Sequence, residues 1–231
     1  MSRSPGRTAT SVADPAGDRV SPRERLAGPA LNVAPRLLGA RIVSTVGGAP
    51  VVVRLTEVEA YAGAQDPASH AFRGETARNA VMFGPPGHLY CYFTYGMHWC
   101  ANVVCGAAGV ATAVLLRAGE VVEGVPTART RRPAARGPRD LARGPARLAG
   151  CLGLDRATDG VDLCDPASPV VLTGVRARRP AGVLTGPRVG VAAAPDRPWR
   201  FWLAGEPTVS SYRAAGRRSA PYAEPPGTLV P

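Results

Sequence analysis

The chain has 231 residues, of which 45% are hydrophobic and 19% are charged, values typical of one globular domain with room for a core. No apolar run is long enough to cross a membrane, and residues 1–30 are too polar and proline-rich for a signal peptide, which argues against membrane and secreted classes. The formal net charge of +11 indicates an anionic partner, with nucleic acid as the first candidate, although a solvated basic face would give the same count.

Several elements are predicted in the first half of the chain. Residues 1–28 contain few apolar residues and many chain breakers, so we expect a disordered basic arm there. One domain is predicted over 29–215, and it begins with a short helix that runs into a strand. The stretch 51–61 is rich in β-branched residues and is the clearest strand. A loop-rich region, 62–88, follows it. Further strands are expected over 89–94, 101–104 and 110–117.

The second half of the chain is more basic, and glycine and proline interrupt its predicted elements more often. Residues 117–147 carry eight arginines against three acids. Pro145 suits the first turn of a helix over 146–154, where its missing N–H costs nothing. Strand-like pieces are expected over 170–175, 188–194 and 198–205. Residues 216–231 are predicted to be a frayed tail.

Two residue types limit the chemistry. All 28 basic residues are arginine, so no lysine is available to form a Schiff base, and only the N-terminal amine remains for that role. The five cysteines are odd in number and lack CxxC spacing. We therefore expect reduced, mostly buried thiols in a cytoplasmic protein. A metal site at Cys91, Cys100 and Cys105 is disfavoured, because the spacings match no common ligand pattern.

Residues 59–102 are the richest part of the chain in chemistry-bearing side chains. They hold all three histidines and eight of the thirteen aromatic residues. This mixture suits a pocket that stacks a planar ligand and binds its edge. An aromatic core cluster is the competing interpretation. The polar edges of tyrosine and histidine, which need partners when buried, favour the pocket.

Strand alternation predicts which of these side chains lie together. Glu57, Glu59 and Tyr61 fall on one face of the strand over 51–61, and that face is either solvated or lines a polar site. Tyr90 and Tyr92 share a face of a second strand. Glu57 is a charged neighbour that could raise the pKa of Glu59, but we expect it to point to solvent.

These motifs, taken in order, resemble one known family. The runs TEVEAY, RNAVMFGPPGHLYCYFTYGMHWCANVV, VLLR, RGPARL, RVGV and PWRFWLAGEPTVS, together with His70, resemble the methylpurine-type 3-methyladenine (alkyladenine) DNA glycosylases. The likeness covers roughly residues 30 to 212. It implies a single α+β domain with a curved, mostly antiparallel, open-barrel-like β-sheet flanked by helices. It implies no metal and no organic cofactor.

The resemblance also implies roles for individual residues. Glu59 matches the general base, and Arg117 and the carbonyl of Val189 match the groups that hold the attacking water. The base pocket would be formed by Tyr61, Tyr92, His70 and Asn102. Tyr95 matches the side chain that wedges into the duplex, with Met97 beside it. From the basic charge we add the DNA-backbone contacts Arg73, Arg78, Arg143 and Arg147.

The predicted function is a monofunctional DNA glycosylase in base excision repair, which flips alkylated or deaminated purines out of duplex DNA. We expect a monomer that works on the nucleoid, with no membrane partner. One alternative is a non-catalytic binder of exposed bases in DNA or RNA. Another is a glycosidase with Glu57 and Glu59 as its carboxylate pair, although neighbours on one strand lie too close together to flank a bond. His98 and the 103–116 loop depart from the family pattern near the wedge and the pocket.

Overall fold

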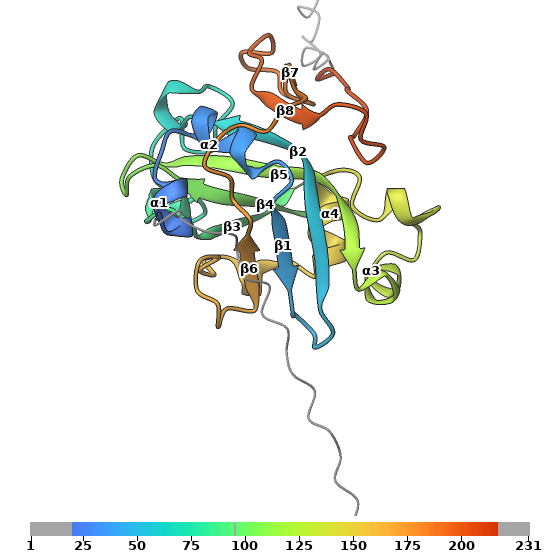
Figure 1. Cartoon of the computed structure of the whole chain (residues 1–231). Coiled ribbons are helices and arrows are strands. Elements are labelled where there is room, and N and C mark those ends of the chain that lie inside the picture. The colour runs from blue at the N-terminus through green and yellow to red at the C-terminus, as the bar shows by residue number, and fades with distance from the viewer. Residues whose placement is uncertain (1–19, 95, 217–231) are drawn as a thin grey trace, which may run out of the picture.

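The two longest strands, β2 (Val51–Tyr61) and β5 (Thr112–Glu123), lie side by side at the centre of the structure (Figure 1). The computed structural model describes residues 20–94 and 96–216. Within them the pairings are antiparallel and the strand order is β3-β4-β5-β2-β1-β6, with β8 pairing with both β2 and β7. The other strands are β1 (Arg41–Ser44), β3 (Leu89–Thr94), β4 (His98–Cys105), β6 (Val170–Thr173), β7 (Val183–Gly186) and β8 (Arg200–Leu203).

Strand β2 changes its neighbour halfway along its length. On the side away from β5, its first residues pair with β1, whereas Glu57, Val58 and Glu59 pair with β8. The register of β2 against β5 also shifts on both sides of Glu57. Such irregularities bend a strand and increase its twist. The sheet therefore curls, and the second half of β2 lies between β5 and β8.

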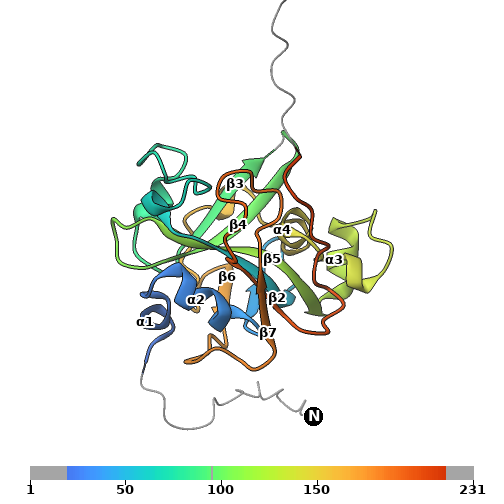
Figure 2. The same ribbon diagram turned by 90° about the horizontal axis from the view of Figure 1, so that it is seen from above.

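Four α-helices in the described residues flank this sheet. They are α1 (Pro22–Leu26), α2 (Ala30–Leu37), α3 (Val125–Arg131) and α4 (Pro145–Leu152). Seen from two directions, α1 and α2 lie on one side of β2 and β5, and α3 and α4 lie on the other (Figures 1 and 2). Leu37 of α2 and Leu148 of α4 are fully buried in one core with Leu55 and Leu116 of the central strands. The expected α+β fold with a curved, mostly antiparallel sheet is confirmed.

Some of the predicted elements are present as expected and others differ. Pro145 stands in the first turn of α4, as expected. The strand expected over 110–117 begins at Thr112 and continues to Glu123 as β5. The piece 188–194 forms no strand in the structure, and β7 and α3 were not expected. Short 3-10 turns complete the description: Gly63–Gln65, Ala80–Phe83, Pro138–Asp140 and Arg156–Thr158.

Regular structure is present before residue 29. Helix α1 lies within the range expected to be a disordered arm, and Ser21 and Glu24 form a capping box at its start. Leu26 at its end is fully buried in the core, which anchors the helix. Residues 1–19 of the expected arm and 217–231 of the expected tail lie outside the described residues.

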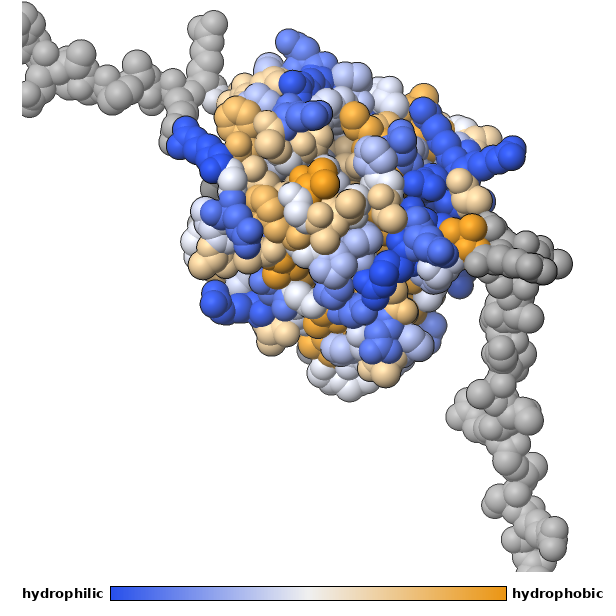
Figure 3. Space-filling model, turned by 90° about the vertical axis from the view of Figure 1, so that its left-hand side faces the viewer, coloured by the Kyte–Doolittle hydropathy of each residue, from blue (hydrophilic) through white to orange (hydrophobic). Residues whose placement is uncertain are grey.

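The side of the molecule that carries α1 has apolar side chains at its surface among hydrophilic ones (Figure 3). Residues from 27–31, 62–65 and 106–112 line a groove, and none of them is charged. The titratable groups described below therefore lie elsewhere. No helix in the described part of the chain combines the length and the hydropathy needed to cross a membrane.

Candidate active site

Glu59 is fully buried in the second half of β2, and both oxygens of its carboxylate have partners. Oε1 accepts the backbone N–H of Val189 over 2.7 Å and lies 3.2 Å from Nη1 of Arg117. Oε2 accepts the hydroxyl of Tyr61 over 2.9 Å. Tyr61 is two residues further along the same strand, so the two side chains share a face.

Glu57 is also fully buried, so the expectation that it points to solvent is wrong. Its Oε1 accepts Nε of Arg117 over 2.9 Å and Nε of Arg200 over 2.6 Å. The backbone N–H of Ser210 donates to Oε2 over 2.7 Å. Two arginines and a backbone donor thus compensate for the burial of this carboxylate, and they come from β5, β8 and the segment after β8.

Arg117 connects the two carboxylates. Besides its contacts with Glu57 and Glu59, Nη2 donates to the hydroxyl of Ser210 over 3.1 Å. Arg117 is only 6% exposed, so its charge acts in surroundings of low dielectric constant. The arrangement fixes the plane of the guanidinium and directs Nη1 at Glu59.

The surroundings of Glu59 shift its proton affinity. Burial raises the pKa of Glu59, and Arg117, the Val189 N–H and the Tyr61 hydroxyl oppose that rise. The charge of Glu57 acts in the same direction as burial. Burial and then the charge of Glu59 raise the pKa of Tyr61 well above its ordinary value, so the phenol stays protonated and donates. Glu59 is therefore a stronger base than a carboxylate in water.

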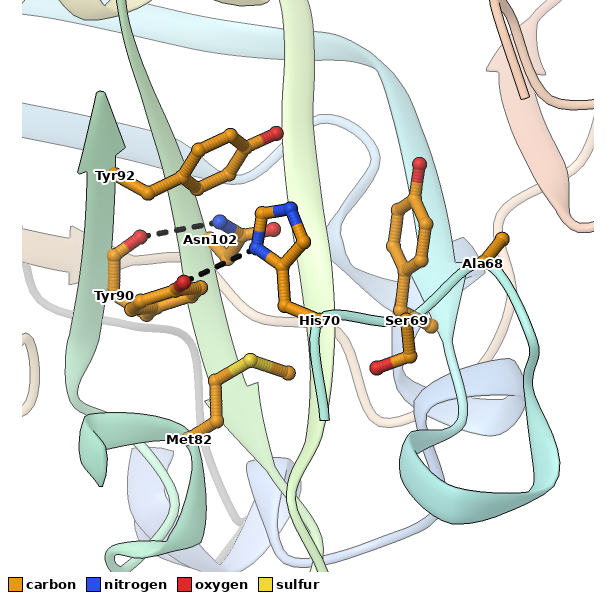
Figure 4. Close-up of a pocket in the computed structure, with 8 residues that line it drawn as sticks. Ala68, Ser69, His70, Met82, Tyr90, Tyr92 and Asn102 are labelled. Carbon is orange, nitrogen blue, oxygen red and sulfur yellow. Dashed lines mark hydrogen bonds between the residues drawn. The ribbon is translucent and has the colours of Figure 1, made fainter. Parts of the chain in front are cut away.

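A pocket lies on the Tyr61 side of Glu59. Tyr92, Tyr90 and Asn102 from β3 and β4 line it beside His70, and Met82 lies below Tyr90 (Figure 4). Its full lining is Tyr61, Ala68, Ser69, His70, Met82, Tyr90, Tyr92 and Asn102. All four residues predicted for a base pocket are thus brought together. Tyr90, Ser69 and Met82 were not predicted as site residues, although Tyr90 shares a strand face with Tyr92.

Hydrogen bonds hold the polar side chains of this pocket in place. Nδ1 of His70 lies 3.1 Å from the Tyr90 hydroxyl, and its ring meets that of Tyr92 edge-on with 4.5 Å between centroids. Burial and then the nearby Arg78 charge lower the pKa of His70. The His70 ring is therefore neutral at neutral pH. Nδ2 of Asn102 donates to the carbonyl of Tyr90 over 3.1 Å.

A buried ion pair supports Tyr61 from outside the pocket. Arg188 is 1% exposed, and its Nη1 and Nη2 donate to the two carboxylate oxygens of Asp66 over 2.5 and 2.8 Å. Its guanidinium carbon lies 4.6 Å from the centre of the Tyr61 ring. The neighbouring residue is Val189, which binds Glu59. Sequence reasoning missed this pair, and only the quoted RVGV run drew attention to its arginine.

The arginines predicted to contact DNA lie in different surroundings. Arg78 donates to the carbonyl of Phe93 over 2.9 Å, beside the Tyr92 ring. Arg143 donates to the carbonyl of Val209 over 2.9 Å, and Arg147 pairs with Asp140. Arg143 and Arg147 line a second pocket together with Arg117. Arg73 is exposed in the loop before the 3-10 turn at Ala80–Phe83.

Of the two predicted wedge residues, Met97 lies in the turn between β3 and β4 and is 67% exposed. Tyr95, the other predicted wedge residue, lies outside the described residues. His98, which departs from the family pattern, is exposed at the start of β4.

The cysteines are thiols in the structure. Cys91, Cys100, Cys105 and Cys151 are buried and Cys164 is half-buried. Burial raises the pKa of Cys91, Cys105 and Cys151 to about 12. Among residues 20–94 and 96–216, no group of three histidine, cysteine or acidic side chains could hold a metal ion.

Known proteins of one family are similar to this chain along most of its length. The family model described as methylpurine-DNA glycosylase matches residues 24–207. A protein of Streptomyces avermitilis named "Putative 3-methyladenine DNA glycosylase" is 57% identical over 194 residues, which are 83% of this chain and 91% of that protein. A protein of Frankia casuarinae with the same name is 53% identical over 198 residues, 82% of this chain and 91% of its own length. The chain belongs to the methylpurine-DNA glycosylase family.

Proposed function

We propose that this protein is a monofunctional DNA glycosylase that extrudes alkylated or deaminated purines from duplex DNA and hydrolyses their N-glycosidic bond with a water activated by Glu59. The observation that carries the proposal is the hydrogen bond between Tyr61 and Glu59. It joins the wall of an aromatic pocket to a buried carboxylate, so a base in the pocket has its sugar beside a general base. The products are the free base and an abasic site.

The pocket suits a purine that carries positive charge. Tyr61 and Tyr92 would contact the two faces of the base, and electron-rich rings attract a cationic alkylpurine more strongly than a neutral base. His70 is neutral and can bind the edge of the base. Asn102, whose amide is fixed by Tyr90, would disfavour the 2-amino group of normal guanine.

The hydrolytic step uses the groups around Glu59. As water attacks C1′, its proton passes to the ionised carboxylate, and the electron pair of the glycosidic bond passes to the departing purine. A cationic purine then leaves as a neutral molecule, whereas a neutral lesion needs a proton from an acid. Arg117 and the carbonyl of Val189 would hold the water. The N–H of Val189 already fixes the carboxylate that the water must face.

Extrusion of the base needs a side chain that intercalates in its place and residues that bind the DNA backbone. Tyr95 and Met97 would fill the gap in the duplex, at a cost of roughly a few kcal/mol for unstacking. Arg73, Arg78, Arg143 and Arg147 would bind phosphates of double-stranded DNA. Contacts of this kind make affinity fall steeply with salt. We infer a monomer, because one chain supplies every group named in this mechanism.

Strand cleavage after base release needs an amine that attacks C1′. The chain has no lysine, and the N-terminal amine is its only amine. We therefore expect the protein to release the base without lyase activity.

The experiment that tests the proposal measures base release from a labelled duplex with one hypoxanthine or ethenoadenine, and from methylated DNA. The wild type is compared with Glu59→Gln, and abasic sites are read with and without alkali. We expect alkali-dependent cleavage by the wild type alone, while the variant keeps its affinity for lesion DNA. Cleavage without alkali would overturn the monofunctional assignment.

Two further outcomes would replace the proposal. Equal base release by wild type and Glu59→Gln would remove Glu59 from the chemistry. No release by either protein from any of these substrates would instead favour a basic domain that only binds exposed bases. Glu120→Gln is a matched control, because Glu120 is a carboxylate on the exposed end of β5 that pairs only with Arg54 among the described residues.

A further inference from the structure

A second pocket is lined by Arg117 and Val189, the two residues that contact Oε1 of Glu59. It has about 290 Å³ of free space, ample for a phosphate group, and no acidic side chain lines it. Its lining consists of Arg117, Arg143, Arg147, Val189, Ser210, Ser211 and Arg213. Four arginines and two serines around one hollow make a site for an anion.

The two oxygens of Glu59 relate the two pockets to each other. Oε2 binds Tyr61, which lines the aromatic pocket. Oε1 binds Val189 and Arg117, which both line the second pocket. A nucleotide with its base in the first pocket and its C1′ at Glu59 would therefore have its sugar and phosphate next to the second pocket.

The arginines of the second pocket are not equally available to a ligand. Arg117 is engaged by Glu57 and Glu59, and Arg147 pairs with Asp140. Arg143 uses Nε for the carbonyl of Val209, which leaves its terminal nitrogens for other partners. The exposed guanidinium of Arg213 has no acceptor among residues 20–94 and 96–216.

The backbone that carries Arg213 is anchored although its side chain is exposed. The carbonyl of Arg213 accepts the N–H of Gly190 over 2.9 Å. Earlier in the same segment, Ser210 binds Glu57 and Arg117, and Val209 binds Arg143. The segment after β8 (Figure 2, red) thus contacts Glu57 and Arg117 through Ser210, and it brings Arg213 to the second pocket.

We propose that this second pocket binds the DNA phosphodiester beside the extruded nucleotide, with Arg143 and Arg213 as its cationic donors and Ser211 as a hydroxyl donor. The inference rests on the proposed function and adds Arg213 and Ser211 to the DNA contacts. Binding the phosphate here would hold the deoxyribose between the two pockets, with C1′ facing Glu59. Arg213 acts on DNA and does not touch the reacting bond.

The test combines a protein variant with a modified substrate. A neutral methylphosphonate replaces each phosphate near the lesion in turn, and single-turnover base release is measured for the wild type and Arg213→Gln. Loss of a hydrogen bond to a charged group lowers kcat/KM by roughly tenfold or more. We expect one methylphosphonate position to lower kcat/KM of the wild type by this factor. The same position should lower kcat/KM of Arg213→Gln by a clearly smaller factor, because only Arg143 and Ser211 then remain to bind the phosphate.

Arg178→Gln is the matched control, because Arg178 is an exposed arginine between β6 and β7 and lines neither pocket. If the loss of kcat/KM from Arg213→Gln and the loss from each methylphosphonate are independent, so that the combined loss is their product at every position, the inference is overturned. It is also overturned if inorganic phosphate binds at the pocket while the two losses remain independent, because that result would indicate a site for free phosphate. If the wild type releases no base from unmodified lesion DNA, the proposed function itself fails, and this result is distinct from the other two.

Discussion

Nε of Arg117 donates to Oε1 of Glu57 over 2.9 Å, and this contact orients the arginine toward Glu59. Glu57 does not line the aromatic pocket, and its other donors are Arg200 and Ser210. Its hydrogen bonds connect it to Glu59 only through Arg117. We therefore expect Glu57 to be a positioning residue rather than a second catalytic carboxylate.

Glu57→Gln should lower the rate of base release with little change in KM. An amide can still accept one hydrogen bond, but it loses the charge that holds two arginines, so Nη1 of Arg117 is no longer fixed. A displacement of about 1 Å at a catalytic group can cost roughly 10²-fold in rate. Single-turnover excision over a range of protein concentrations separates the two constants. A variant that loses only affinity would contradict the positioning role.

The pH dependence of base release should report Glu59. Since the base must be ionised and burial raises its pKa above the ordinary 4.5, activity should fall on acidification already above pH 4.5. The Tyr61 hydroxyl donates to the ionised carboxylate and lowers this pKa. Tyr61→Phe should therefore move the acid limb to higher pH, whereas Tyr212→Phe, an exposed tyrosine outside both pockets, should not. The comparison uses a cationic lesion, because release of a neutral lesion also depends on an acid.

His70 should titrate below the ordinary histidine pKa of 6.5, because burial and the charge of Arg78 both disfavour the imidazolium. NMR titration of the imidazole signals measures this directly, with His70→Gln to assign the resonance. Arg78→Gln removes one of the two causes and should raise the pKa of His70. A value that stays fixed in the variant would show that the arginine does not act on the ring.

Asp66→Asn should be strongly destabilising. It leaves the buried Arg188 charge without its carboxylate, which typically costs about 3–5 kcal/mol of the free energy of unfolding. Asp162→Asn is the comparison, because the Arg23–Asp162 pair is partly exposed and such pairs contribute at most about 1 kcal/mol. Urea denaturation of the two variants measures the difference. Similar losses in both would mean that solvent reaches Arg188.

The part of the site that lies on one strand was predictable from the sequence. Glu59 and Tyr61 share a face because side chains alternate along β2, and Tyr90 and Tyr92 do the same on β3. Helix α4 was predictable because Pro145 marks its first turn. These inferences depend only on residues that are close in the sequence, because the local backbone geometry fixes the direction of their side chains.

The rest depended on contacts between distant segments. Glu57 was expected in solvent because its partner Arg200 is 143 residues away on β8, and nothing local indicates that β8 replaces β1 beside it. Asp66 and Arg188 are separated by 122 residues, and neither stands in a periodic pattern. The run 188–194 is apolar enough for a strand, but its first residues are committed to Asp66 and Glu59 instead of a ladder.

The buried thiols have a consequence for survival of the protein under chemical stress. Electrophiles that alkylate DNA also attack thiolates and amines, and a thiol with a pKa of about 12 is almost wholly protonated in neutral solution. The chain offers such reagents no lysine either. A methylating agent that creates the damaged purines proposed as substrates should therefore react slowly with these three thiols.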